Sequence, residues 1–365
     1  MSVRSVMKIA AVAALGSLAL TGCGSKPGSG TSGSGSSGAT SAAKAVGKKI
    51  NACMVLDTGG VDDRSFNQSS YDGMKAANKA NPNISIKYVP SNSGADYTPN
   101  LTKLATGGCA TVIGVGGLMS DNVKTAAKTY PKVHFAEVDA PGTGANFYGI
   151  QYNTAQAGFL GGYLAASLTK TGKVGTWGGL NIPPVTIYMD GFTEGVQYYN
   201  TQKKKNVQVL GWNEKSKKGT FSNSFTDQNK GKSVSQSMAS NGADIIFPVA
   251  GGSGLGAGAA AQASGGKLKI MWVDTDGCVS AAQYCKYMVG SVTKNLSGGV
   301  QAYLKSSADG TYPTGNYIGT LANAGVGLVD DNNSQPAALK AELAKVKAGI
   351  TSGSIKITSP SQPTS

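Results

Sequence analysis

The feature that most constrains the fold is a repeated alternation of short apolar runs with helical stretches, beginning near residue 48. Runs such as INACMVLD, ATVIGVGG and VHFAEVD are rich in Val and Ile, and amphipathic or Ala-rich stretches separate them. Parallel strands covered by helices on both faces have this nearly continuous apolar character. The pattern therefore predicts an α/β protein built from βαβ units.

The alternation occurs in two successive sets. The first set runs from INACMVLD to NFYGIQY, and the second begins with the apolar helix NTAQAGFLGGYLAASLTK and continues to LKIMWVD. A further strand and helix follow in YMVGSVTKNLSGGVQAYLKSSADG, and ALKAELAKVKAGITSGSIKIT supplies a last helix and an edge strand. Two sets of similar size predict two doubly wound parallel-sheet domains.

The N-terminus has the pattern of an export signal. Two basic residues, Arg4 and Lys8, precede an apolar run (residues 9–20) that is too short to span a bilayer as a stable helix. The next residues, LTGC, end at Cys23 and resemble a bacterial lipobox. We expect residues 1–22 to be removed and Cys23 to be acylated, which would anchor the protein by lipid at the extracytoplasmic face of the cell membrane. The alternative is a plain signal peptide followed by an incidental cysteine.

Residues 23–47 are mostly Gly, Ser, Thr and Ala, a composition typical of a flexible tether. The formal charge of +14 falls to +12 without Arg4 and Lys8. The lysines are scattered or lie in stretches such as TQKKKN and EKSKKG, without interleaved aromatic residues. This favours solvated faces or contact with an anionic membrane surface, and argues against nucleic acid as a partner.

Four cysteines follow Cys23, namely Cys53, Cys109, Cys278 and Cys285. An even number outside the cytosol permits two disulfides, with three possible pairings. We favour a short loop closed by the last two cysteines, and a link between the first two, which would join the starts of two strands that could be neighbours. A zinc site is not expected, because there is no C-x-x-C and the only histidine is His134.

Polar residues and glycines recur where the predicted strands end. In open parallel sheets, ligands bind beyond the carboxyl ends of the strands. The residues at these ends are Asp57, Gly116, Gly117, Asp139, Gly251, Gly252 and Asp274, and Lys294 follows a later strand. Each aspartate could simply cap a helix, but ionised carboxylates also accept hydrogen bonds from hydroxyls and ring N–H groups. The set favours a polyhydroxylated or heterocyclic ligand over a phosphate.

Two phenylalanines occupy matching loop-to-helix junctions in the two predicted domains. Phe66 lies beside Asn67 in DDRSFNQ, and Phe225 lies in GTFSNSFTDQNKG. Either could be a hydrophobic staple that fixes the start of a helix. Alternatively, the two rings form a stacking platform, since a flat aromatic face can stack on any base.

The stretch VAGGSGLGAGAA offers a competing interpretation. Gly254-x-Gly256-x-x-Ala259 follows a strand, and Asp274 and Asp276 come about twenty residues later, as in a dinucleotide-binding fingerprint. Such a match is weak in a glycine-rich chain, and an exported protein has no ready supply of NAD. We therefore expect no cofactor.

Enzymatic motifs are absent from the sequence. There is no G-x-S-x-G, H-E-x-x-H or phosphate-binding loop. His134 lies inside an apparent strand, between Val133 and Phe135, where a structural histidine is the default. We therefore predict a binding protein with no catalytic residues and no metal.

At LDTGGVDDRSFNQSSYDGMKAA the chain resembles the basic membrane protein family of lipoproteins. These are substrate-binding components of nucleoside ABC transporters and include the purine nucleoside receptor lipoproteins. Further matches are VIGVGGLMSD, YPKVHFAEVD, AGFLGGYLAA, KVGTWGGLNIPPV, GADIIFPVAGGSGLG, WVDTD and SVTKNL. The resemblance covers roughly residues 48–357.

The resemblance implies a type I periplasmic-binding-protein fold, with two lobes joined by a hinge of three crossings. Expected boundaries are residues 48–151 plus 278–315 for lobe 1, residues 152–277 plus 316–357 for lobe 2, and a flexible tail at 358–365. It also implies roles for individual residues. The base would lie between Phe66 and Phe225, its edge would bond Asp57, Asn67 and Asp139, and the ribose would be held by Gly251, Asp274 or Asp276, and Lys294.

The implied function is capture of nucleosides, with purines favoured, for delivery to an ABC permease and its ATPase. One alternative is the same fold binding another small polar ligand, such as a sugar or a signalling molecule, or acting as a sensor. The other alternative is a secreted enzyme that processes nucleosides.

Overall fold

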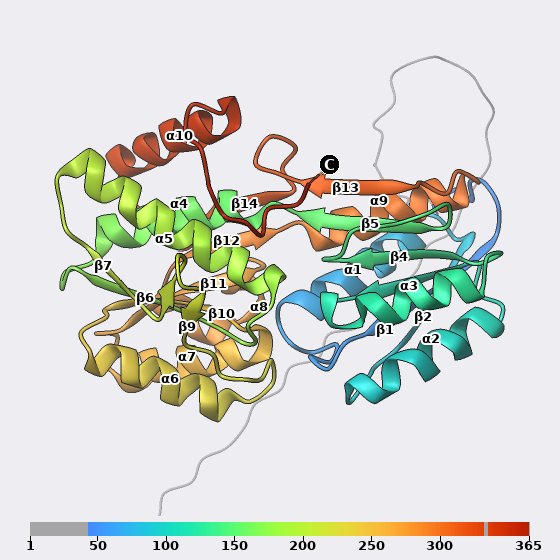
Figure 1. Ribbon diagram of the computed structural model, residues 1–365, viewed down its shortest axis with the longest axis horizontal. Coiled ribbons are helices and arrows are strands. Elements are labelled where there is room, and N and C mark those ends of the chain that lie inside the picture. Colours follow the sequence, from blue (N-terminus) through green and yellow to red (C-terminus); the bar gives the residue numbers. More distant parts are fainter. Residues whose placement is uncertain (1–42, 332–334, 365) are drawn as a thin grey trace, which may run out of the picture. The chain divides into compact units, whose positions relative to one another are not determined.

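The computed structural model describes residues 43–331 and 335–364, which form two lobes, each built on a six-stranded sheet (Figure 1). The predicted signal peptide, Cys23 and most of the predicted tether lie outside the described residues. Within the described part, no helix has the length and apolar character needed to cross a membrane.

The first sheet is entirely parallel. In spatial order it contains β13 (Gly315–Gly319), β5 (Phe147–Tyr152), β4 (His134–Val138), β3 (Thr111–Val115), β1 (Ile50–Leu56) and β2 (Ile84–Val89). Two pairs of helices cover it: α1 (Phe66–Ala80) with α9 (Leu296–Ala308), and α2 (Tyr97–Thr106) with α3 (Ser120–Thr129). Alternate residues of β1 join different cores. Met54 packs with α1 and α9, and Val55 packs with α2 and α3.

The second sheet repeats this plan with one antiparallel edge. In spatial order it contains β14 (Val326–Val329), β12 (Met288–Lys294), β11 (Lys269–Asp274), β10 (Ile245–Val249), β6 (Lys173–Gly178) and β7 (Gln208–Leu210). Its helices are α4 (Thr154–Leu168), α5 (Pro183–Lys203), α6 (Gln228–Ser240), α7 (Leu255–Ala263) and α10 (Ala337–Ser352). Smaller elements are β8 (Trp212–Asn213), β9 (Lys218–Gly219) and α8 (Gly277–Ser280).

Helix α4 is buried along most of its length, as its apolar sequence predicts. Glycines let its backbone approach α5 closely, since a Cβ on Gly162 would lie 1.9 Å from the carbonyl oxygen of Phe192. The α4–α5 pair forms one layer against the second sheet, with α10 outside it (Figure 1).

The chain crosses between the lobes three times, as expected. The crossings lie at Asn153, at Asn295, and at residues 320–325 between β13 and β14. The predicted lobe boundaries were wrong, however. Residues 278–294 belong with the second sheet, because β12 pairs with β11, and residues 316–319 belong to the first sheet as part of β13. An apolar run predicts a strand but does not indicate which sheet the strand will join.

The C-terminal segment also differs from the prediction. Among residues 353–364 there is no strand, so the edge strand expected in SIKIT is absent, and β14 forms an edge of the second sheet. The tail, expected to be flexible, instead crosses α5. The backbone N–H of Thr358 donates to the Glu194 carboxylate at 3.0 Å, and the Ser359 hydroxyl donates to Asp190. Further along, Asn153 of the first crossing donates to Gln362 at 3.0 Å.

Both favoured disulfides are present. Cys53 in β1 is bonded to Cys109, just before β3, and Cys278 is bonded to Cys285. Strands β1 and β3 are neighbours, and the first bond links the middle of β1 to the residue two positions before β3.

Candidate functional site

A cavity lies where the carboxyl ends of both sheets face each other between the lobes. Its walls include eight of the nine predicted ligand-binding residues, which are Asp57, Phe66, Asn67, Asp139, Phe225, Gly251, Asp274 and Lys294. The other walls include Asp63, Leu118, Ile182, Val185 and Tyr188. This is the position at which doubly wound sheets bind their ligands.

The loop between β1 and α1 is organised by Asp63, which sequence reasoning overlooked. Its carboxylate accepts hydrogen bonds from the backbone N–H groups of Ser65 (3.0 Å), Asn67 (2.8 Å) and Gln68 (3.1 Å). These bonds hold Arg64 in the left-handed region (φ 59°) and set the start of α1. Burial raises the pKa of Asp63 to about 7. The loop thereby carries Phe66 and Asn67 to the cavity wall.

Asp57 and Asn67 form a polar pair in the first lobe. Asp57 Oδ1 accepts from the backbone N–H of Gly59 (2.9 Å) and from Asn67 Nδ2 (2.7 Å). Burial raises the pKa of Asp57, and the bond from Asn67 partly opposes this effect. Asn67 Oδ1 is buried with no partner among the described residues. A buried acceptor without a donor is costly, so this oxygen is ready to accept from a ligand.

A second polar group in the cavity is centred on Lys294, whose ammonium group contacts carboxylates of both lobes. Its side chain is 3% exposed, and Nζ lies 2.7 Å from Asp139 Oδ2 and 3.7 Å from Asp274 Oδ1. Burial raises the pKa of Asp139, while the Lys294 charge lowers it. The same Nζ lies 4.7 Å from the centroid of the Phe66 ring, close enough for a cation–π contact.

Tyr188 and Ser65 hold Asp274 from opposite lobes. The Tyr188 hydroxyl donates to Asp274 Oδ1 at 2.8 Å, and the Ser65 hydroxyl donates to Oδ2 at 2.7 Å. The pKa of Tyr188 is raised well above its usual value, chiefly by burial, so the phenol remains a donor. Arg64 adds contacts between the lobes, because its carbonyl accepts from Trp272 and Thr275.

Tyr188 was missed because it lies inside α5, near the start of the helix, where no strand-end signal marks it. Its helical neighbours are apolar, and its role depends on α5 passing beside the end of β11. Ser65 and Asp63 were quoted only as parts of the DDRSFNQ stretch.

Phe66 and Phe225 reach the cavity from different lobes, and both are half-buried. Phe66 is the first residue of α1 and follows the N-cap, so it is not placed as a hydrophobic staple, which would precede it. Phe225 packs over Gly179, where a Cβ would lie 2.3 Å from the ring. Ile182 and Val185 add apolar surface to the same cavity.

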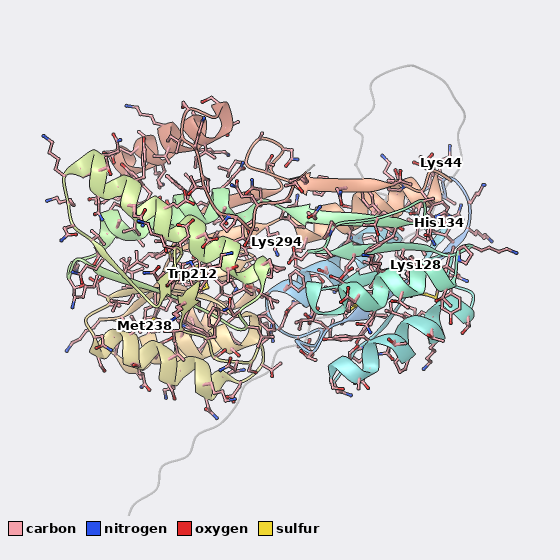
Figure 2. All side chains as sticks on the ribbon, in the orientation of Figure 1. Lys44, Lys128, His134, Trp212, Met238 and Lys294 are labelled. Atoms are coloured by element: carbon pink, nitrogen blue, oxygen red, sulfur yellow. A yellow bond between two sulfur atoms is a disulfide. The ribbon has the colours of Figure 1, made fainter. Side chains whose placement is uncertain are left out.

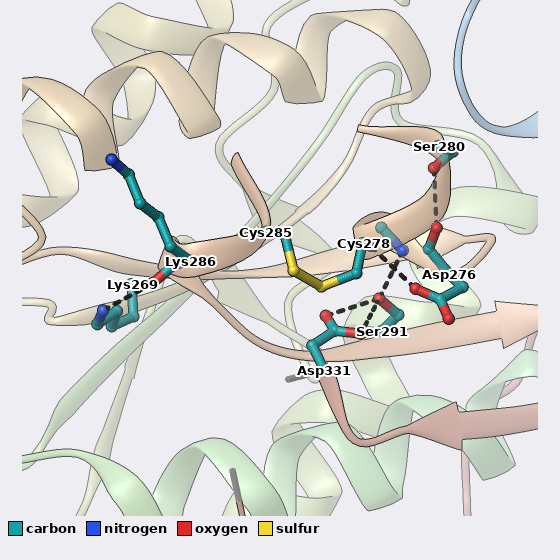
Figure 3. The surroundings of a disulfide bond; sticks show 9 residues. Lys269, Asp276, Cys278, Ser280, Cys285, Lys286, Ser291 and Asp331 are labelled. Atoms are coloured by element: carbon teal, nitrogen blue, oxygen red, sulfur yellow. Dashed lines mark hydrogen bonds between the residues drawn. A yellow bond between two sulfur atoms is a disulfide. The ribbon is translucent and has the colours of Figure 1, made fainter. Parts of the chain in front are cut away.

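Two other sequence hypotheses find structural explanations. Asp276 does not line this cavity. It caps α8 by accepting from the backbone N–H of Cys278 at 2.9 Å, beside the Cys278–Cys285 disulfide and near Asp331 (Figure 3). In the glycine-rich stretch, Gly256 serves helix packing, since a Cβ there would lie 2.1 Å from the Gln228 carbonyl oxygen of α6.

His134 lies at the start of β4, far from the carboxyl ends of the strands. Its ring stacks on Tyr312 with centroids 3.5 Å apart, and burial lowers its pKa. Figure 2 shows it at the far end of the first lobe from Lys294. It therefore has no part in the cavity.

The charge of the cavity excludes some ligands. Four aspartates (Asp57, Asp63, Asp139 and Asp274) line it with a single lysine. A phosphate would meet an excess of carboxylates, whereas hydroxyl and N–H donors would find acceptors. The cavity suits a neutral ligand with one flat apolar part and several polar hydrogens.

Solved structures define the class of fold. A crystal structure of ABC transporter system solute-binding proteins from Aeropyrum pernix K1 superposes with a TM-score of 0.75, covering 85% of this chain and 94% of that one at 23% identity. A solute-binding protein of an ABC transporter system from Conexibacter woesei gives a TM-score of 0.64 at 21% identity, covering 84% and 98%. The predicted type I periplasmic-binding-protein fold, an α/β fold with two parallel-sheet lobes, is confirmed.

Sequence relatives define the family. Residues 50–360 match the family described as ABC transporter substrate-binding protein PnrA-like, and the chain belongs to this family. It is 30% identical to the "ABC transporter nucleoside-binding protein BmpA" of Lactococcus lactis, over 98% of this chain and 99% of that protein. It is 32% identical to the "CD4+ T-cell-stimulating antigen" of Listeria monocytogenes, covering 87% and 89%. Members are substrate-binding proteins and not enzymes, as the sequence predicted.

Proposed function

We propose that this chain binds nucleosides, with purines favoured, between its two lobes and delivers them to an ABC permease. The observation that carries this proposal is the pairing of Phe66 and Phe225, one from each lobe, in a cavity rich in hydrogen-bond acceptors. Two aromatic faces suit a flat heterocycle, and the acceptors suit its N–H groups and the hydroxyls of a sugar.

The polar residues divide into two groups with different roles. Asp57 and Asn67 would bond the edge of the base, since Asn67 Oδ1 needs a donor. Asp139, Asp274 and Lys294 would bond ribose hydroxyls, with Gly251 close to the sugar. A ligand without these hydroxyls would leave buried polar atoms unpaired, at a cost of about 1–3 kcal/mol each.

The membrane attachment belongs to the same proposal. LTGC at residues 20–23 supports acylation of Cys23, and transport of a captured ligand requires a permease and an ATPase in that membrane. The relative from Lactococcus lactis is described as an ABC transporter protein, which supports the same partners.

Calorimetric titration of the purified protein tests the ligand. The panel should contain guanosine, inosine, adenosine, uridine and cytidine, their 2′-deoxy forms, free bases, ribose and glucose. We expect the purine ribonucleosides to bind most tightly. Absence of binding by every nucleoside at millimolar concentration, or tighter binding of a sugar, would refute the proposal.

A further inference from the structure

The end of the first lobe opposite the cavity carries a cluster of exposed lysines. Because the first sheet is parallel, the amino-terminal ends of its strands and the carboxyl ends of its helices meet at this end. Helices α1, α2, α3 and α9 each have a lysine in the last turn. We call the cluster the basic edge, and its eight members are Lys44, Lys48, Lys49, Lys79, Lys103, Lys128, Lys132 and Lys305.

Within the described part of the chain, no ion pair neutralises the charges of the basic edge. The segments that form it (residues 43–50, 78–84, 103–111, 128–134 and 305–315) contain a single acidic residue, Asp309. None of the ion pairs found among residues 43–331 and 335–364 involves one of the eight lysines. Figure 2 shows Lys44 and Lys128 at this end, away from Lys294.

Helix dipoles do not account for the cluster. A lysine near a helix C-terminus is favourable, but Lys44, Lys48, Lys49 and Lys132 do not lie on helices. In the second lobe, α5 ends with Lys203, but α4, α6, α7 and α10 end without a basic residue in the last turn. Most long helices of the second lobe therefore form without such lysines.

The described chain begins at the basic edge. The backbone of Val46 exchanges hydrogen bonds with the Asn81 side chain (3.1 and 2.8 Å), and the N–H of Lys48 donates to the carbonyl of Ala308 at 2.7 Å. Ala43 follows Cys23 by 20 residues in the sequence, so the basic edge holds the described residues that are nearest in sequence to the proposed lipid anchor. Val46 is 52% exposed and adds an apolar side chain among the lysines.

We propose that the basic edge is a docking surface for an anionic lipid bilayer. Each lysine near such a surface strengthens binding about fivefold, and the attraction extends over a Debye length of about 8–10 Å at physiological salt. Val46 enters the headgroup region among the lysines. Docked in this way, the first lobe rests on the bilayer, and the second lobe moves about the three crossings. The inference goes beyond ligand capture and does not depend on which ligand is bound.

Co-sedimentation with vesicles tests the proposal without the lipid anchor. The full chain carrying Cys23→Ser is mixed with vesicles of phosphatidylglycerol and phosphatidylcholine (1:1), or of phosphatidylcholine alone. We expect binding to the anionic vesicles only, and weaker binding as salt is raised. The test variant combines Lys44→Gln, Lys48→Gln, Lys128→Gln and Lys132→Gln, and its partition coefficient should fall at least tenfold.

A matched variant on the second lobe provides the control. Lys170, Lys204, Lys267 and Lys286 are also exposed, and their joint replacement by Gln removes the same charge. This variant should bind vesicles within about twofold of the unchanged chain. Equal losses in the two variants, no binding to anionic vesicles, or equally strong binding to a DNA duplex would overturn the proposal. Nucleoside titration of the same samples reports separately on the proposed ligand.

Discussion

The two lobes present different chemistry to the cavity. In the first lobe, Asn67 Oδ1 is buried and has no partner among the described residues. In the second lobe, both oxygens of Asp274 are already bonded, one by Tyr188 and one by Ser65. Buried carboxylates away from the cavity show the same difference between the two lobes. Glu137 in β4 has one oxygen without a partner, whereas both oxygens of Asp190 in α5 accept a hydrogen bond, from Trp212 and Ser359.

The difference suggests separate roles for the two lobes under the proposed function. An unpartnered buried acceptor gains most when a ligand supplies a donor, so Asn67 in the first lobe would form a hydrogen bond that only a ligand can complete. The second lobe offers a carboxylate held in place by neighbours, which reduces the cost of ordering the site on binding. Lys294 links the two arrangements, because it contacts Asp139 in one lobe and Asp274 in its own.

Replacing Lys294 by Met should have the largest effect. The change leaves Asp139 and Asp274 buried and close together without a cation. Breaking a buried ion pair in this way costs about 3–5 kcal/mol, and nucleoside binding should be lost as well. Denaturant unfolding measures the loss of stability. Adding Asp139→Asn should restore part of it.

Lys203→Met is the matched control for Lys294→Met. Lys203 pairs with Glu342 at 2.8 Å, but both side chains are more than a third exposed. Exposed pairs contribute about 0–1 kcal/mol. A loss of stability as large as that of Lys294→Met would show that the buried ion pairs of Lys294 contribute no more to stability than this exposed pair.

Replacing Glu137 by Gln should stabilise the protein in a pH-dependent manner. Burial raises the pKa of Glu137 from 4.5 to about 8, so the folded state favours the protonated carboxyl. The stability that this proton supports is fully present below pH 4.5 and is lost as the pH rises through 8. The unfolding free energy of the variant should therefore exceed that of the unchanged protein by a growing margin between pH 5 and 8. Each unit of pKa corresponds to about 1.4 kcal/mol.

Asp190→Leu tests the other side of this comparison. The leucine would leave the buried Trp212 indole N–H, which donates to Asp190 Oδ1 at 2.8 Å, without an acceptor. We expect destabilisation at pH 7, opposite in sign to the effect of Glu137→Gln. If both variants stabilise the protein, the proposed difference between the buried carboxylates of the two lobes is wrong.

Replacing Tyr188 by Phe should weaken nucleoside binding by about 1.5–3 kcal/mol, the range for a hydrogen bond to a charged group. Asp274 would lose the donor that positions it toward the ribose. The ratio of affinities between a ribonucleoside and its deoxy form should fall, an effect that general loosening of the fold would not produce. Calorimetry measures the ratio. Tyr303→Phe, a buried tyrosine bonded to Thr111 in the first lobe, should leave it unchanged.

Replacing Phe225 by Ala should weaken binding by about 1–3 kcal/mol through lost stacking, with little loss of stability. Phe66→Ala should weaken binding similarly but also lower stability slightly, because the Phe66 ring contacts Lys294. Calorimetry and thermal unfolding of both variants separate the two effects. Equal losses of folding and binding in Phe225→Ala would favour a structural role for this ring.

Much of the site was predictable because parallel strands bring their carboxyl ends together. Asp57, Asp139, Asp274 and Lys294 all follow apolar runs, and their convergence is a consequence of the sheet. Asp276 was retained as an alternative because it stands two residues from Asp274. The shift of two residues places Asp276 just before α8, where it caps the helix.

The amino-acid sequence by itself determined the α/β class, the two sets of strands and the residues at the strand ends, since these depend on local periodicity. The tertiary structure alone decided which sheet takes β12, where the tail packs and which side chains hold Asp274. Such choices depend on contacts between residues far apart in the chain. Ser65 and Asp274 are 209 residues apart, and Tyr188 and Asp274 are 86 apart. No local sequence pattern predicts these contacts, because the partner of a buried polar group depends on how whole helices and strands pack.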